Sequence, residues 1–434
     1  MPTLAHARVG NDIVRIALVS TFYSPWSLGG DGLAVAQLAK ALRRRGHCVQ
    51  VIFSYDAYSV LSAGLEEVPS GKSESGFVPV KSRLPKLELA ATYLTGHPVG
   101  SRRSLQRALS GPWDILHYHN PSLLGGPAIM QMGIADLKLY TMHEQWLVCP
   151  THVLYRYNRE VCTERHCVRC CLASRRPPQP WRATRLMSHA TAGIDRFIAP
   201  SRTTAELNKS IAPLAKTTVL ANFTPEPQAS FKKEMQDYFL YVGRLEPIKG
   251  IVPLLRDFAR LTDLNLVVAG DGRQRPLVEQ LAAAAPHIRF LGRLGGADLD
   301  ALYAGAVATI VPSTGHESFP LVVAESLARS TPVIVRALGA LKEISEQSEG
   351  AVLPFRTFDE FAVILRSLAE DHARAVALGL RGRVVQQRRW SEEVHVSAYF
   401  RLIAKEAARK GAERLAQLAT TASTALPPPG DGGP

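Results

Sequence analysis

The sequence predicts an α/β protein built from two doubly wound domains, and three observations lead to this prediction. Residues 13–20 form an apolar stretch that a glycine-containing loop joins to an amphipathic segment and then to a second apolar stretch, the order strand, helix, strand. The same alternation begins again at residues 238–243. Between the two units, residues 222–230 are polar and rich in proline, as linkers are. Alternating strands and helices indicate parallel sheets with helices on both faces.

Length, composition and charge restrict the class of protein. The 434 residues allow two or three domains with substantial cores, and 46% of them are hydrophobic. No stretch approaches the roughly 18 apolar residues of a membrane span, and the N-terminus lacks the basic-then-apolar order of a signal peptide. We therefore expect a cytoplasmic protein. The net charge of +13 favours an anionic substrate or peripheral contact with an anionic membrane; an arginine-rich background composition is the alternative. No nucleic-acid motif is present, so nucleic acid is not an expected partner.

The loop after the first predicted strand is rich in glycine. Gly29, Gly30 and Gly32 lie between that strand and the helix that follows it. Glycine lets the backbone turn sharply or approach a ligand closely. The usual spacing of a dinucleotide-binding fingerprint is absent, so the glycines alone do not identify a ligand.

Three histidines lie on or at the end of two further predicted strands. His117 and His119 alternate along the first of these strands and therefore point to the same side. His143 ends the strand that begins at residue 137. Open α/β sheets place ligands at the carboxyl ends of their strands, so we expect His119 and His143 near a substrate. Structural hydrogen bonding is the expected role of His117 and the alternative for the other two.

Five of the six cysteines fall within the segment 149–171. Two of them have the spacing of metal ligands, and clustered cysteines in a cytoplasmic protein suggest metal rather than disulfides. Structural zinc and a loop with free thiols are both open interpretations. The candidate ligands are Cys149, Cys162, Cys167 and Cys170, with His152 and His166 as alternatives.

The second predicted domain begins with a strand that is followed by two cations. Arg244 and Lys249 stand at the carboxyl end of this strand, where a pair of cations can oppose the charge of a diphosphate. A solvated loop is the alternative. Gly270 ends the next predicted strand, and Arg293 follows the one after it.

Two glutamates mark the strand, loop, helix and strand predicted between residues 306 and 335. Glu317 stands in the loop before the helix, and Glu325 lies inside the helix among apolar neighbours. Carboxylates in such a place can accept hydrogen bonds from sugar or ribose hydroxyls. The alternative is that Glu317 helps to cap the helix and Glu325 pairs with an arginine.

The start of the same helix is a predicted anion site. Pro320 suits the first turn, and Ser318 is the expected cap. The free backbone N–H groups near Phe319 and Leu321 can bind phosphate, although Pro320 lacks one.

These segments together resemble the retaining glycosyltransferases of family 4, which have the two-domain GT-B fold. The family carries two glutamates separated by seven residues, as Glu317 and Glu325 are. The resemblance extends to VGRLEPIKG (242–250), VVAGDG (267–272) and FLGRL (290–294), and to TPVIV and GALKEI downstream. One departure is Glu-Ser-Phe-Pro at the first glutamate, where many members have Glu-Gly-Phe-Gly.

The resemblance implies two Rossmann-like domains that face each other across a cleft. Residues 1–222 would form the acceptor-side domain with the cysteine-rich insertion, 223–236 the linker, and 237–390 the domain that binds a nucleotide diphosphate sugar. A single helix at 391–418 would pack back toward the first domain, ahead of a disordered tail at 419–434.

The resemblance also assigns roles to the residues above. The expected catalytic residues are Glu317, Arg244, Lys249 and His143. The expected donor-binding residues are Gly30, Arg244, Lys249, Gly270, Arg293, Glu317, Ser318, Phe319, Pro320, Leu321 and Glu325. Gly29, Gly30, His119 and His143 are expected on the acceptor side. The acceptor would be a glycan, a lipid-linked glycan or a small molecule, in a pathway such as polysaccharide biosynthesis.

Transfer in this family requires no metal, so any zinc would be structural. The nucleotide, UDP, GDP or another, and the sugar stay open. Two rival interpretations also stay open: a catalytically inactive binding or scaffold protein with the same fold, and a nucleotide-sugar epimerase of the same architecture.

Overall fold

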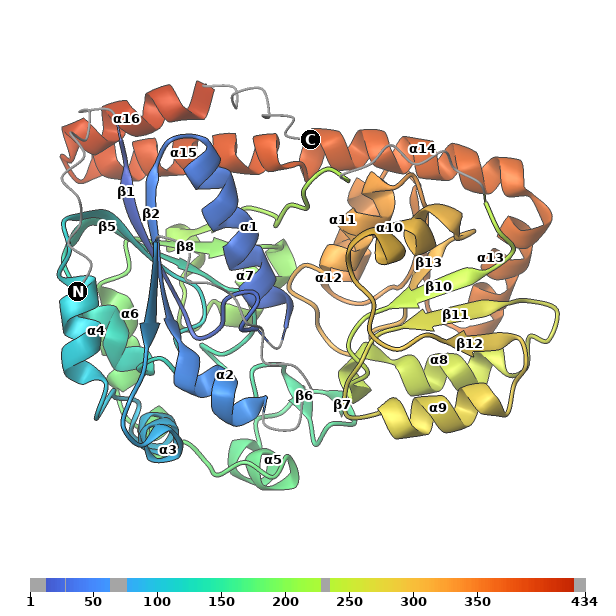
Figure 1. Cartoon of the computed structure of the whole chain (residues 1–434), viewed down its shortest axis with the longest axis horizontal. Helices are drawn as coiled ribbons and strands as arrows, with labels where there is room; N and C mark the ends of the chain where they lie inside the picture. Colours follow the sequence, from blue (N-terminus) through green and yellow to red (C-terminus); the bar gives the residue numbers. More distant parts are fainter. Residues whose placement is uncertain (1–12, 28, 63–75, 228–234, 425–434) are drawn as a thin grey trace.

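The protein has two α/β lobes, each built on one parallel sheet (Figure 1). This computed structural model describes residues 13–27, 29–62, 76–227 and 235–424. Part of the predicted linker, 228–234, and the predicted tail beyond residue 424 lie outside the described residues. A small antiparallel hairpin, β6 (Tyr155–Arg156) and β7 (Glu160–Val161), stands apart from both sheets.

The first sheet has seven parallel strands in the order β3-β2-β1-β4-β5-β8-β9. Its strands are β1 (Arg15–Ser20), β2 (Cys48–Ser54), β3 (Phe77–Val80), β4 (Trp113–Tyr118), β5 (Ala135–Thr141), β8 (Arg196–Ala199) and β9 (Thr217–Val219). Its helices are α1 (Gly30–Arg44), α2 (Tyr55–Leu61), α3 (Pro85–Thr95), α4 (Arg102–Leu109), α5 (Cys167–Ala173), α6 (Leu186–Ala192) and α7 (Arg202–Asn208), with short 3₁₀ turns η1 (Pro127–Gln131), η2 (Pro180–Ala183) and η3 (Leu214–Lys216).

Strand β1 lies near the middle of this sheet and is buried on both faces. Ala17 and Val19 pack into one apolar cluster, whereas Ile16 and Leu18 pack into another on the opposite face. Burial on both faces is why such strands are continuous apolar runs in the sequence instead of alternating ones.

The second sheet has six parallel strands in the order β12-β11-β10-β13-β14-β15. Its strands are β10 (Phe239–Val242), β11 (Leu266–Ala269), β12 (Ile288–Phe290), β13 (Thr309–Val311), β14 (Val333–Arg336) and β15 (Val352–Phe355). Its helices are α8 (Ile251–Phe258), α9 (Arg275–Ala283), α10 (Gly296–Gly305), α11 (Leu321–Ala328), α12 (Ala340–Gln347), α13 (Phe358–Glu370) and α14 (His372–Arg389), with the 3₁₀ turn η4 (Pro247–Lys249).

The chain returns to the first lobe through α15 (Glu392–Arg409) and α16 (Glu413–Thr424), along one edge of the molecule (Figure 1). Tyr399 and Phe400 of α15 share an apolar cluster with Ile16 and Leu18 of β1. The two lobes are therefore connected both by the linker and by this helical return.

The prediction of a single helix at 391–418 is wrong in two respects. The segment breaks near Gly411, whose φ of +74° is left-handed and ends α15. A second helix then continues to Thr424, so residues 419–424 are helical and not part of a disordered tail. The apolar periodicity continues across the break, which hides it in the sequence.

A buried ion pair anchors α15 to the first sheet. The side chain of Glu406 is fully buried, and its Oε1 accepts a hydrogen bond from Arg196 Nε of β8 at 3.0 Å. Burial alone would raise the pKa of Glu406, but hydrogen bonds from Arg409 and Arg196 outweigh it and hold the pKa below its ordinary value. The stability that the Glu406 carboxylate contributes is therefore fully present above the pKa that it has in the unfolded chain. This stability is lost as the pH falls through the lower pKa that Glu406 has in the folded protein.

We expect Glu406→Gln to lower the free energy of unfolding at pH 7 by about 3 kcal/mol, because Arg196 loses its charged partner. Urea unfolding at pH 7 and pH 3.5 measures this, and the difference from wild type should shrink at the lower pH. Glu413→Gln, at an exposed position of α16, is the control. Similar losses in the two variants would contradict an anchoring role for Glu406.

Candidate active site

The second sheet has a topological switch point between β10 and β13. The chain adds β11 and β12 on one side of β10 and then β14 and β15 on the far side of β13. Loops at the carboxyl ends of the two strands diverge at such a point and leave a crevice in which open α/β sheets bind ligands. The loop after β10 carries Arg244 and Lys249, and the loop after β13 carries Glu317.

Lys249 and Glu317 form an ion pair across this switch point. Lys249 Nζ lies 2.6 Å from Glu317 Oε1, and Ser313 Oγ donates to the same oxygen at 2.7 Å. In the described part of the chain, Oε2 takes no hydrogen bond and can accept one from a ligand hydroxyl. Burial would raise the pKa of Glu317, but Lys249 and Ser313 outweigh this effect and lower it, so the carboxylate is ionised at neutral pH.

Three other expected donor-side residues lie after strands of the same sheet. Arg244 is exposed at the end of β10, and its charge also contributes to the lowered pKa of Glu317. Arg293 is likewise exposed after β12. Gly270 has a structural explanation, because a Cβ at this position would lie 1.9 Å from the carbonyl oxygen of Gly243.

Glu325 lies inside α11, where its Oε2 accepts a hydrogen bond from Tyr303 at 2.9 Å. Burial raises its pKa, although the Tyr303 hydrogen bond and Arg329 oppose the change. The alternative that this carboxylate pairs with an arginine is wrong, because Arg329 pairs with Asp300 and donates only to the backbone carbonyl of Glu325. Within the described residues, the Glu325 carboxylate thus accepts from Tyr303 alone.

The predicted cap of α11 is wrong. The helix begins at Leu321, Pro320 is its N-cap residue, and no side chain caps it. Ser318 Oγ instead accepts a hydrogen bond from Gln145 Nε2 of the first lobe at 3.3 Å. Phe319 is buried and packs edge-on against Trp390. This contact holds the loop between β13 and α11 against the residue that follows α14.

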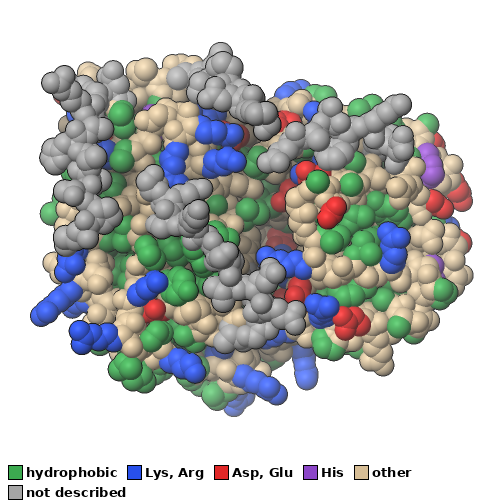
Figure 2. Space-filling view, viewed as in Figure 1, with side chains coloured by type: hydrophobic (Ala, Val, Ile, Leu, Met, Phe, Trp, Pro, Cys, Tyr) green, Lys and Arg blue, Asp and Glu red, His purple; other side chains and the backbone are tan. Residues whose placement is uncertain are grey.

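The first sheet has its own switch point, between β1 and β4. The prediction that the glycines lie between β1 and the helix holds only for Gly29, the N-cap residue, because α1 begins at Gly30. A Cβ at Gly30 would lie 3.8 Å from Leu321 Cδ1 of α11. The two switch points therefore face each other, and Figure 2 shows the surface hollowed between the lobes with acidic and basic side chains along the hollow.

His143 stands at the carboxyl end of β5, and His119 lies behind it. His119 Nδ1 and His143 Nε2 share a hydrogen bond of 2.9 Å. Only 2% of His119 is exposed, so it supports His143 instead of reaching a substrate itself. Burial lowers the pKa of His143 to about 4, with Asp31 opposing the change, and the imidazole is neutral at pH 7. His117 bonds Thr141 and Tyr399, a structural role.

The described residues do not show the zinc site predicted from the cysteines. Among the residues that the structure describes, no group of three or more His, Cys, Asp or Glu side chains is arranged to hold a metal ion. The thiols hydrogen-bond locally instead: Cys149 with Thr151, and Cys162 with the carbonyl of Glu164. Burial also raises the pKa of the Cys162 thiol, and the neighbouring thiols of Cys149, Cys167 and Cys170 raise it further.

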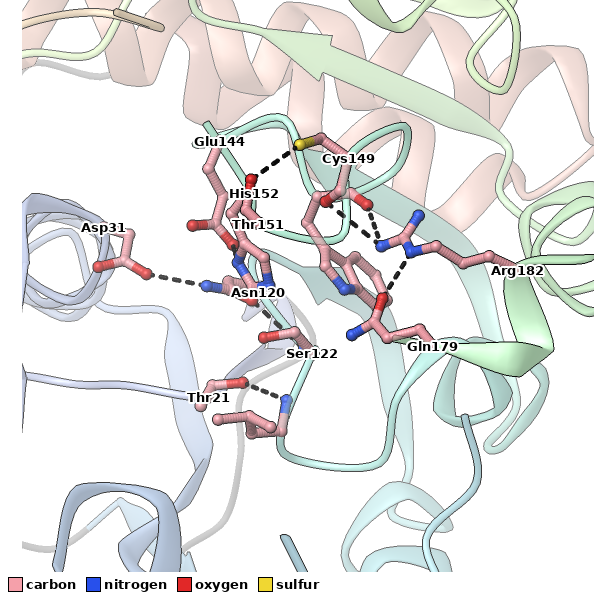
Figure 3. A network of polar contacts seen from close by, with 12 residues as sticks. Thr21, Asp31, Asn120, Ser122, Glu144, Cys149, Thr151, His152, Gln179 and Arg182 are labelled. Atoms are coloured by element: carbon pink, nitrogen blue, oxygen red, sulfur yellow. Dashed lines mark hydrogen bonds and ion pairs between the residues drawn. The ribbon is translucent and has the colours of Figure 1, made fainter. Parts of the chain in front are cut away.

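Other contacts hold the insertion in place. Arg182 donates to the carbonyl oxygens of Trp146 at 2.6 Å and Leu147 at 3.2 Å, and its guanidinium lies over the Trp181 ring. Figure 3 shows the same side chain reaching Gln179 and the backbone of Cys149. The insertion also reaches the second lobe, where Tyr155 OH lies 3.0 Å from Thr314 Oγ1.

Four contributors to the site were not predicted from the sequence: Ser313, Tyr303, Gln145 and Tyr155. Ser313 follows the strand β13 in a Pro-Ser pair, which signals only a turn. The other three reach the site from elements distant in the chain, and no local pattern distinguishes them from ordinary surface or core residues.

Comparison with known proteins identifies the family. A model described as Glycosyltransferase Family 4 matches residues 28–225, and one described as Glycosyl transferases group 1 matches residues 222–385. A D-inositol 3-phosphate glycosyltransferase of Actinosynnema mirum is 30% identical over 366 residues, which cover 75% of this chain and 82% of that protein. The chain belongs to glycosyltransferase family 4. A phosphatidyl-myo-inositol mannosyltransferase of Mycolicibacterium smegmatis is 25% identical, over a region that covers 82% of this chain and 85% of that protein.

Solved structures agree with the fold. Sucrose-phosphate synthase from Thermosynechococcus elongatus superimposes with a TM-score of 0.67 at 19% identity, covering 91% of this chain and all of that one. Anabaena HepE in complex with UDP gives a TM-score of 0.59 at 15% identity, covering 90% of this chain and 99% of that one. The predicted GT-B fold is confirmed, and this family 4 member is a glycosyltransferase that uses a nucleotide sugar.

Proposed function

We propose that this glycosyltransferase is a retaining enzyme that binds a nucleoside diphosphate sugar at the switch point of its second sheet. The observation that carries the proposal is the Lys249–Glu317 pair, which presents a cation and a carboxylate side by side. Lys249 and Arg244 would face the diphosphate, and the free Oε2 of Glu317 would accept from a sugar hydroxyl. Glu325, two turns further along, would accept from the ribose.

In the proposed reaction the bond between the sugar's anomeric carbon and the diphosphate oxygen breaks while the acceptor oxygen bonds to the same face. The departing phosphate oxygen takes the acceptor's proton, so no side chain serves as base. Arg244, Lys249 and the N–H groups at the start of α11 stabilise the charge that develops on the diphosphate. His143, whose Nε2 is occupied by His119, would present Nδ1 to a hydroxyl.

Slow hydrolysis of candidate donors tests the proposal. The protein is incubated with UDP-glucose, UDP-N-acetylglucosamine, GDP-mannose and ADP-glucose, and the sugar that forms first is followed by proton NMR. Release of the α-sugar from an α-linked donor supports retention, whereas release of the β-sugar overturns it. No turnover of any of the four donors counts against the proposed donor site, and a new nucleotide sugar without hydrolysis counts against retaining transfer.

We further propose that the first lobe makes peripheral contact with anionic membranes, where a lipid-linked acceptor would reside. None of the helices in the described part of the chain combines the length and apolar character needed to cross a bilayer. However, Leu84 and Leu87 at the start of α3 are 63% and 65% exposed, and Leu172 of α5 is 61% exposed. Figure 2 shows Lys and Arg side chains beside apolar ones along the edge of the first lobe that α3 and α5 occupy. Apolar side chains among cations suit an anionic interface.

Sedimentation with vesicles tests this contact. We expect binding to vesicles with 30% phosphatidylglycerol but not to pure phosphatidylcholine, and at least fivefold weaker binding after Leu84→Ser with Leu87→Ser. Leu380→Ser, an exposed leucine of α14 on the other lobe, is the control. Equal binding to both vesicle types, or equal loss in the control, would exclude this surface.

A further inference from the structure

A small cavity lies where α1, the carboxyl ends of β4 and β5, and α15 meet. Its volume is about 20 Å³, enough for one water molecule. Its lining includes Gln37 of α1, His119, His143 and His395 of α15. The proposed transfer reaction gives this cavity no role.

We propose that one water molecule binds in the cavity, accepts a hydrogen bond from His119 Nε2 and thereby sets the tautomer of His143. His119 is then a positioning residue for His143. The consequence for the substrate rests on the proposed function, whereas the tautomer is a property of the protein alone.

Two polar atoms at this cavity lack a partner. Among the residues that the structure describes, His119 Nε2 and Gln37 Oε1 are buried atoms without a hydrogen bond. Only 2% of His119 is exposed, so its ring is shielded from bulk water. Buried water is found in polar cavities, where it completes the hydrogen bonds of such atoms. Because both residues line one cavity of this size, a single water molecule can serve both atoms.

The direction of these hydrogen bonds follows from the groups around the cavity. Gln37 Oε1 can only accept, so the water donates to it. His395 Nδ1 lies 2.7 Å from the carbonyl oxygen of Ala221, which also can only accept, so Nδ1 carries the proton. Burial lowers the pKa of His395 to about 4, and Nε2 of the neutral ring is therefore an acceptor. Two acceptors thus face the two protons of the water, which leaves its lone pair for a proton on His119 Nε2.

The tautomer of His119 then determines that of His143. Burial lowers the pKa of His119 well below its ordinary value, so the ring is neutral and has a single N–H. With that proton on Nε2, Nδ1 of His119 is an acceptor, and His143 Nε2 at 2.9 Å must be the donor. His143 is also neutral, so its Nδ1 carries a lone pair. Under the proposed function, His143 therefore accepts a hydrogen bond from a substrate hydroxyl and does not donate one.

The opposite arrangement would place the protons on Nδ1 of both rings. Asp31 is the group that could favour it, because its charge raises the pKa of His143 against the effect of burial. However, Asp31 Oδ2 accepts from Asn120 Nδ2 at 3.1 Å (Figure 3), and no hydrogen bond joins Asp31 to His143 in the described part of the chain. This arrangement would also leave His119 Nε2 without a proton to give to the water.

Nitrogen-15 NMR of the protein labelled at histidine tests the inference at pH 7. Long-range correlations between the ring nitrogens and the carbon-bound ring protons distinguish the two tautomers, and His119→Gln and His143→Gln assign the two rings. We expect Nε2–H on both rings, together with a nuclear Overhauser contact between the Nε2 proton of His119 and a long-lived water. Nδ1–H on either ring, or a wild-type spectrum without that water contact, overturns the inference.

Gln37→Leu tests the role of the water directly. The leucine removes an acceptor of the water, so the water contact of His119 should be lost, and a population with Nδ1–H should appear at His119 and His143. The matched control is Gln417→Leu, at an exposed position of α16, which should keep the wild-type pattern. The inference also fails if Gln37→Leu keeps that pattern.

These spectra separate the inference from the proposed function. They are recorded without substrate, so they decide the tautomer of His143 even if no donor is hydrolysed. Absence of donor hydrolysis would count against the proposed function alone.

Discussion

Lys249→Ala and Arg244→Ala are each expected to lower kcat/KM by about 10²- to 10³-fold. Both side chains stand at the carboxyl end of β10, where they would oppose the charge on a departing diphosphate. Loss of such a contact in a crevice costs about 2–4 kcal/mol of transition-state stabilisation. Steady-state kinetics with the donor that is hydrolysed fastest measures the effect.

The two variants should differ in stability. Arg244 is exposed, so its removal should leave the Tm close to that of wild type. Lys249 neutralises the mostly buried carboxylate of Glu317, so Lys249→Ala should also lower the Tm. Arg273→Ala, which removes an exposed partner of Glu246 after β11, is the control for a general loss of charge near the site. If kcat/KM stays within a few-fold in both variants, neither cation stabilises the leaving group.

Glu317 and Glu325 are expected to act on different parts of one donor. Glu317→Gln keeps the shape of the side chain but removes the charge near the developing positive charge of the sugar, so kcat should fall about 10²-fold while the free nucleoside diphosphate still binds. Glu325→Ala removes the acceptor for ribose, so the affinity for that diphosphate should fall about tenfold or more, from about 1.5–3 kcal/mol per charged hydrogen bond.

Calorimetry of both variants with UDP and GDP measures these affinities. Equal losses in the two variants, or a loss only in Glu317→Gln, would refute the division of roles.

Glu325→Gln adds a stability test. Burial raises the pKa of Glu325 in the folded protein above its value in the unfolded chain. The folded protein therefore loses stability as the pH rises from the pKa of the unfolded state through that of the folded state. At pH 7 the neutral variant should therefore have a Tm equal to or above that of wild type, with weaker nucleotide binding.

The position of each proposed donor-side residue in the fold follows from its place in the sequence. Arg244, Lys249 and Glu317 each follow an apolar strand closely in the sequence, and that short distance places them beyond the strand's carboxyl end. Glu325 lies inside α11, the helix that follows the same loop as Glu317. His143 follows the same rule on the first sheet. The acceptor side was less predictable, because its loops carry no comparable motif.

The sequence by itself determined the two doubly wound sheets and the loops that carry the candidate site. Parallel strands buried on both faces must be continuous apolar runs, and such runs are visible without coordinates. Only the tertiary structure decided the partners: Lys249 with Glu317, His119 with His143, Glu144 with His152, and the local hydrogen bonds of Cys149 and Cys162. It also decided that Ser318 contacts Gln145 instead of capping α11. The physical reason is a difference in precision. A hydrogen bond tolerates changes of only a few tenths of an ångström between donor and acceptor, and strand order, loop path and rotamer together determine that distance. Apolar patterning depends only on which face of an element is buried.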